Sequence, residues 1–141
     1  MAARTPPAAD PPTRTPSFVC AVPLRVTRPQ ERILLARLEA ARQVYNACLG
    51  QARIRARLVR ESKAFQRART LPREDPQRKR LFAQARGQHA FSAYALHAYA
   101  QPLGQSWLGD HLDSLTLQKR ASRAYDAANR VLLGKGEARA L

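Results

Sequence analysis

The sequence predicts a mainly α-helical fold, a helical bundle with long basic amphipathic helices, preceded by one short β-strand and a proline-rich leader. Three observations lead to this fold class. Apolar residues recur at helical spacing over most of the chain, a single short run has strand character, and arginine is concentrated along the helices. With 141 residues, the chain has the length of one domain.

The two ends of the chain lack an apolar pattern. The first 17 residues hold five prolines and no apolar stretch of signal-peptide length. Such a segment cannot bury enough apolar surface to fold, so residues 1–17 are predicted to be a disordered leader. Residues 135–141 show no pattern either and are predicted to be a disordered tail.

Residues 18–26 have the composition of a β-strand. They are apolar and partly β-branched, from Phe18 to Val26, and Pro23 cannot donate to a ladder, so an edge strand is expected. No second run of this kind follows in the chain. A lone strand leaves its backbone groups unpaired. We therefore expect either a partner outside this chain or a chain that is a fragment.

Residues 27–134 are predicted to form one helical domain. Thr27 and Gln30 have the spacing of a capping box, with Pro29 in the first turn, so a helix should begin there. An apolar stripe then runs over five turns at alternating steps of four and three residues. Its members are Leu34, Leu38, Ala41, Tyr45, Cys48 and Ala52.

Three further helices are expected after this long one. The chain should break at residues 70–72, and Asp75 with Pro76 should open a short helix that reaches about Arg86. Residues 91–99 are apolar around most of a helix, which predicts burial. The last helix should run from Asp113 or Ser114 to Leu133, with Gly134 just beyond its end. Its apolar residues, mostly alanine, should allow close helix packing; they are Leu117, Ala121, Ala124, Ala128 and Val131.

The charge of the chain is strongly one-sided. Its net charge is +15, and arginine supplies 21 of the 25 cations. Arginine binds phosphate in a two-point fashion, and so large a charge repels itself unless a polyanion is near. Nucleic acid, DNA or RNA, is the favoured partner. An anionic membrane surface and a mere bias of composition are the alternatives; no apolar run reaches the roughly 18 residues that span a bilayer.

The cations concentrate between residues 53 and 86, where twelve of them face only three acidic residues. Four arginines share one helical face: Arg53, Arg57, Arg60 and Arg67. A solvated face is the simpler interpretation of a charged run, but such faces normally mix both signs. The sequence therefore predicts a ridge that binds phosphates and positions nucleic acid without reading its sequence.

The sequence shows no catalytic pattern, so we expect no enzyme activity, no metal and no cofactor. Glycine-rich phosphate loops are absent, the three histidines lack metal-ligand spacing, and the ten acidic residues are scattered. Asp110 and Asp113 are predicted to be helix caps rather than a carboxylate pair. The two cysteines, Cys20 and Cys48, suggest no disulfide framework, which fits a reducing cytoplasm.

Two segments resemble a known family. Residues 38–49, with Arg42, Tyr45 and Asn46, are similar to the AR-x-VYN-x-x-L helix near the start of TnpB (OrfB-type) proteins, the transposon-encoded RNA-guided nucleases. The strand and the Thr27–Gln30 box precede that helix in the same order. A later segment resembles the family's WL…VDS-x-x-LQ pattern and its end-of-helix glycine. That segment includes Trp107, Leu108, Asp113, Ser114, Leu115, Gln118 and Gly134.

This resemblance implies a piece of a larger architecture. In the family, the first strand belongs to a wedge barrel, a helical recognition domain follows, and the nuclease domain and zinc ribbon come later. The chain would then be the first wedge strand plus the recognition domain of a transposase, truncated before its nuclease. A second polypeptide carrying the nuclease is a possible partner.

The resemblance also suggests where nucleic acid binds. Gln118 matches a glutamine on the helix that lies against duplex DNA in relatives, where an amide can pair with base edges. Tyr45 lies on the apolar stripe and is expected to pack. The full predicted nucleic-acid-binding set is Arg42, Arg53, Arg57, Arg60, Arg67, Ser114, Gln118, Lys119 and Arg123, and the motif residues are Thr27, Gln30, Tyr45 and Asn46.

Two other interpretations remain open at the level of sequence. The chain could be a stand-alone small regulator that binds DNA or RNA, or a non-functional remnant of an interrupted transposase gene. The first predicts a cooperative melt of the isolated chain. The second predicts nuclease motifs in the downstream reading frame.

Overall fold

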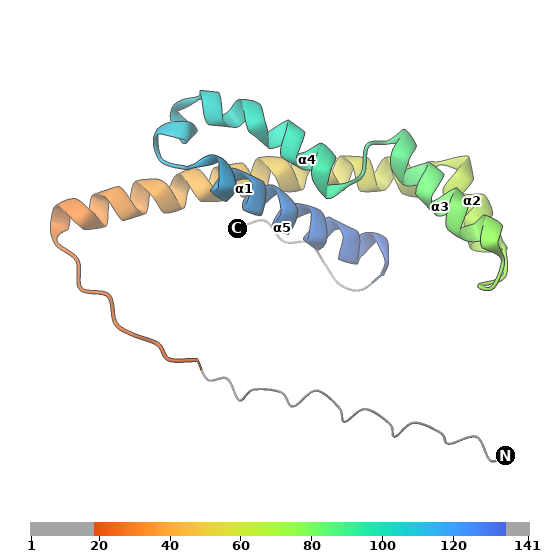
Figure 1. Cartoon of the computed structure of the whole chain (residues 1–141), viewed down its shortest axis with the longest axis horizontal. Coiled ribbons are helices and arrows are strands. Elements are labelled where there is room, and N and C mark those ends of the chain that lie inside the picture. The colour runs from red at the N-terminus through yellow and green to blue at the C-terminus, as the bar shows by residue number, and fades with distance from the viewer. Residues whose placement is uncertain (1–18, 135–141) are drawn as a thin grey trace, which may run out of the picture.

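The fold is known from a computed structural model, which describes residues 19–134. It is mainly helical, as predicted (Figure 1). Five α-helices follow one another: α1 (Arg28–Glu61), α2 (Lys63–Thr70), α3 (Pro76–Gln88), α4 (Ala93–Ala100) and α5 (Ser114–Leu132). Two short 3₁₀ helices, η1 (Gln101–Gln105) and η2 (Trp107–Asp110), connect α4 to α5. The predicted leader and tail lie outside the described residues.

Helix α1 is the longest helix, and the other helices pack against its C-terminal part (Figure 1). Helix α5 runs beside α1 in the same direction, and α4 returns along both. Helices α2 and α3 form an antiparallel pair at the C-terminal end of α1. The first turns of α1 project beyond the bundle.

The predicted strand is wrong for the part of it that the structure describes. Residues 19–26 form no regular secondary structure, and Val19, Val22 and Leu24 are exposed. A strand needs a neighbour to pair its backbone N–H and C=O groups. Since no strand occurs among residues 19–134, the β-branched composition has no ladder to join. Phe18 lies outside the described residues.

The predicted start of the long helix is confirmed. The backbone N–H of Thr27 donates to Gln30 Oε1 at 2.9 Å, and Pro29 occupies the first turn. The expected end of this helix, near residue 70, is wrong. Ser62 leaves the helical conformation and its Oγ accepts from the Phe65 backbone N–H at 3.2 Å, so it caps α2. Serine is a preferred N-cap, and this residue splits the predicted ridge between two helices.

The core lies where α1, α4 and α5 meet, and it is rich in alanine. Among residues 19–134, ten of the twenty buried apolar residues are alanines, which lets helix backbones approach closely. From α5 they include Ala121, Ala124 and Ala128, as the sequence predicted. The larger core side chains are Phe91, Leu49, Leu96, Val44 and Val59.

The later helix boundaries follow their predicted signals. Asp75 Oδ1 accepts from the Gln77 backbone N–H at 2.8 Å and caps α3. Asp113 Oδ1 accepts from the Thr116 backbone N–H at 2.7 Å and caps α5. This hydrogen bond and the one from the Thr116 hydroxyl lower the pKa of the Asp113 carboxyl. Gly134 has a φ of +72°, a left-handed conformation that suits glycine after a helix. Asp110, in contrast, ends η2 instead of capping a helix start.

Candidate nucleic-acid interface

The arginine groove is a hollow of about 380 Å³ between α1 and the last turns of α5. One wall carries the arginines that α1 contributes, Arg53, Arg57 and Arg60. Residues at steps of four and three lie on one side of a helix, so the spacing of these arginines brings them together. The remaining lining residues are apolar: Ala56, Ala128, Val131 and Leu132.

The arginine groove is electropositive because three arginines line it and no acidic residue of the described part of the chain does. Within residues 19–134, none of its three arginines lies within ion-pair distance of a carboxylate. All three side chains are exposed at the surface. Several fixed positive charges in a concave site raise the local concentration of anions.

Other arginines of the same basic stretch hold the fold together. Arg86 donates from Nη1 to Tyr125 Oη at 3.1 Å and from Nη2 to Asn129 Oδ1 at 3.0 Å, so it ties α3 to α5. Arg55 donates to the backbone oxygen of Ala90 at 3.1 Å. These side chains are committed to the protein itself, unlike the three in the arginine groove. Composition alone does not distinguish the two groups.

Arg67, the fourth member of the predicted ridge, lies in a different place. It lines a separate hollow between α2 and α3, of about 480 Å³, together with Lys63, Gln84 and Gln88. Because α1 ends at Glu61, Arg67 belongs to another helix than Arg53, Arg57 and Arg60. The basic stretch therefore presents two cationic hollows.

Ser114 and Gln118 lie together in a third hollow, the amide pocket. It has a volume of about 580 Å³ and lies between α4, η1 and the start of α5. Opposite Ser114 and Gln118, α4 and η1 contribute further polar lining side chains: His97, Gln101 and Gln105. Gln101 and Gln105, which follow α4, were not among the predicted site residues, because no sequence motif marks them. Lys119 and Arg123 are exposed on α5 but line none of the three hollows.

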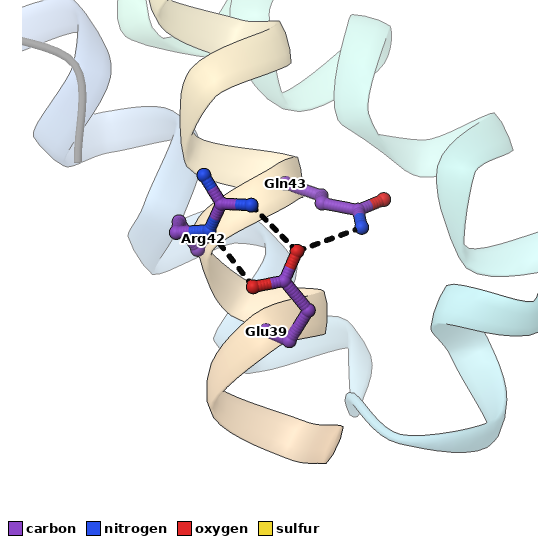
Figure 2. A network of polar contacts seen from close by, with 3 residues as sticks. All are labelled: Glu39, Arg42 and Gln43. Atoms are coloured by element: carbon purple, nitrogen blue, oxygen red, sulfur yellow. Dashed lines mark hydrogen bonds and ion pairs between the residues drawn. The ribbon is translucent and has the colours of Figure 1, made fainter. Parts of the chain in front are cut away.

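Arg42 forms an ion pair on the surface of α1 (Figure 2). Its Nη2 and Nε donate to the two carboxylate oxygens of Glu39, at 2.7 and 2.8 Å, and Gln43 donates to the same carboxylate at 3.0 Å. These hydrogen bonds, Arg42 first, lower the pKa of the Glu39 carboxyl to about 2. The charge of Arg42 is thus compensated by the Glu39 carboxylate, whereas the arginines of the arginine groove have no such partner among residues 19–134.

Three of the remaining motif residues, Thr27, Gln30 and Tyr45, serve the fold. Thr27 and Gln30 make the N-terminal hydrogen bond of α1, and the Tyr45 ring is buried in the core, as expected from its place on the apolar stripe. Asn46, on the next position of α1, is half-buried.

The described part of the chain, residues 19–134, holds neither a metal-ligand cluster nor a membrane-spanning helix. No three histidine, cysteine or acidic side chains come together as metal ligands there. None of the described helices combines the length and apolarity needed to cross a bilayer.

The chain matches no protein-family model, no curated protein and no solved structure.

Proposed function

We propose that this chain is a helical nucleic-acid-binding protein that binds backbone phosphates and does not cleave the nucleic acid. The observation that carries the proposal is the arginine groove, where Arg53, Arg57 and Arg60 share a concave site without an acidic lining residue. Guanidinium groups hold phosphate oxygens in pairs of hydrogen bonds. The net charge of +15 supplies the long-range attraction.

A more specific proposal is that the chain corresponds to the recognition part of a TnpB-type RNA-guided nuclease, acting in the cytoplasm with DNA, guide RNA or both. It rests on the two sequence motifs, of which Arg42, Tyr45 and Asn46 are the first. The amide pocket adds a place where Ser114 and Gln118 could meet base edges. A second polypeptide would then supply the nuclease.

The electrostatic claim is tested by a fluorescence-anisotropy titration of the full chain with labelled DNA and RNA over a range of salt concentrations. A protein with about six phosphate contacts loses affinity with a log–log slope near −5. Replacing Arg53, Arg57 and Arg60 together by glutamine should make that slope shallower by about 3, because each phosphate contact contributes about one unit. Circular dichroism should show that the variant keeps its helices.

Arg32→Gln is the matched control, since Arg32 is an exposed cation on α1 outside the arginine groove. It should make the slope shallower by no more than about one unit, the contribution of a single phosphate contact. The proposal would be overturned if the affinity of the unchanged protein did not depend on salt concentration. It would also be overturned if the triple variant had the same affinity and the same slope as the unchanged protein. Cleavage of DNA by the purified chain with magnesium would contradict the non-catalytic part.

A further inference from the structure

The two walls of the arginine groove differ in chemistry. Helix α1 presents cations, while helix α5 contributes aliphatic side chains, the partly exposed Val131 and the largely buried Leu132, together with Ala128. Ala56 and Ala128 have no side chain beyond Cβ, which leaves space between the two helices. A ligand that fills this hollow must be anionic on one side and apolar on the other.

Duplex nucleic acid does not have that pattern at its surface. Its phosphates lie outside and its bases are stacked inside, so a duplex contacting Arg53, Arg57 and Arg60 offers no exposed base face to the α5 wall. An unpaired nucleotide does, because its base is free to turn away from the backbone and expose an apolar face. Single-strand binding proteins combine a cationic track for the backbone with aromatic side chains for the bases. In the arginine groove, aliphatic side chains take the place of the aromatic ones.

We propose that the arginine groove binds an unpaired segment of nucleic acid, with phosphates on Arg53, Arg57 and Arg60 and a base lying against Val131 and Leu132. This inference rests on the proposed function and specifies its ligand. Charge complementarity favours a nucleic-acid backbone as the occupant. Three guanidinium groups with no carboxylate partner among residues 19–134 lie within about two helical turns, and they call for more than one anion.

The experiment compares three labelled oligonucleotides of equal length with the full chain at one salt concentration. They are a single strand, the same strand in a duplex, and the same strand with abasic sites in its central part, which keeps every phosphate and removes bases. The single strand should bind about fivefold more tightly than the abasic strand, the effect of burying a few tens of Å² of apolar surface. It should also bind more tightly than the duplex.

Two variants assign the effect to the two walls. Val131→Ser should weaken binding of the single strand severalfold and leave the abasic strand and the duplex unchanged. Arg57→Gln should weaken all three probes, because it removes a phosphate contact. Leu115→Ser is the control for the apolar change, since Leu115 is exposed on the same helix α5 but lies outside the arginine groove.

The outcomes separate this inference from the proposed function. Equal binding of the single strand, abasic strand and duplex would overturn the inference and leave phosphate binding intact. A failure of all three probes to bind would overturn both. Binding to phosphatidylglycerol vesicles that Val131→Ser and Arg57→Gln both abolish, without binding to oligonucleotides, would assign the groove to an anionic lipid instead.

Discussion

The two parts of helix α1 carry the same apolar pattern but lie in different surroundings. The first turns of α1, residues 28–39, project beyond the bundle (Figure 1). Apolar side chains are exposed there: Ile33, Leu34, Leu35 and Leu38. From Ala40 onward the same helix is packed against α4 and α5. The predicted stripe of six residues is therefore buried only from Ala41 to Ala52.

This difference shows what an apolar stripe does and does not determine. The spacing of Leu34 and Leu38 matches that of Tyr45 and Cys48, so one pattern predicted one continuous buried face. Burial also requires a second element opposite the stripe. Helix α5 begins only at Ser114 and lies beside the later turns of α1, so the first turns have no neighbour among the described residues.

The largest expected effect comes from removing a leucine in the packed part. Leu49 is 2% exposed, whereas Leu38, eleven residues earlier on the same helix, is 63% exposed. Leu49→Ala should lower the free energy of unfolding by about 2–5 kcal/mol, because it removes buried methyl groups and leaves a cavity. Urea unfolding followed by circular dichroism measures this change.

Leu38→Ala is the matched control, because it makes the same chemical change where little area is buried. It should alter the free energy of unfolding by no more than about 0.5 kcal/mol. A loss for Leu38→Ala as large as that for Leu49→Ala would mean that the projecting turns are covered in solution.

An intermediate effect is expected for thiol reactivity. Burial raises the pKa of the Cys48 thiol to about 11, from an ordinary value near 9. The thiolate is the reactive form, and near pH 8 its fraction at Cys48 should be about a hundredfold smaller than for a thiol with the ordinary pKa. Burial also keeps the reagent from reaching the sulfur, which slows the reaction further. In a Cys20→Ser background, Cys48 should react slowly with Ellman's reagent and faster as pH rises towards 11.

A second thiol at the projecting end provides the comparison. Leu38→Cys in the same Cys20→Ser background should add one thiol that reacts rapidly at pH 8, because position 38 is exposed. Similar rates at positions 38 and 48 would show that both parts of α1 are equally accessible.

The smallest expected effect is a gain in stability on the outer face of the packed part. Gly50 lies in the middle of α1 on its solvent-exposed side, and a Cβ atom added there would meet no other atom within 4 Å. Gly50→Ala should raise the free energy of unfolding by about 0.5–1 kcal/mol, because alanine has the better helix propensity. Thermal melting measures the gain.

Gly109→Ala is the contrasting change. A Cβ atom at Gly109 would overlap the backbone oxygen of Gly104, so this substitution should lower the melting temperature. A destabilising Gly50→Ala would show that the outer face of α1 is in contact with something that the described residues do not include.

Helix boundaries were predictable because they depend on neighbours in the sequence. Thr27, Asp75 and Asp113 all lie where the structure begins a helix, and each supplies or completes a cap. The break at Ser62 was missed although serine is a common cap, since the apolar and basic periodicity continues through it. The strand was predicted from composition and fails because strands depend on a partner.

The candidate site was only partly predictable for the same reason. The spacing of Arg53, Arg57 and Arg60 on one helix anticipated that they lie together. The apolar wall opposite them comes from α5, more than 60 residues later, and only packing brings it there. Arg67 was assigned to the same ridge and lies in another hollow, because α1 ends before it.

By itself, the sequence determined the helical fold class, most of the helix ends and a strong excess of arginine. These depend on local backbone preferences and on formal charge, which each segment carries with it. The tertiary structure decided which turns of α1 are buried, which arginines bond to the protein's own groups, as Arg86 does, and which line the arginine groove. Those outcomes depend on where α4 and α5 pack, since burial and pairing are properties of two surfaces in contact.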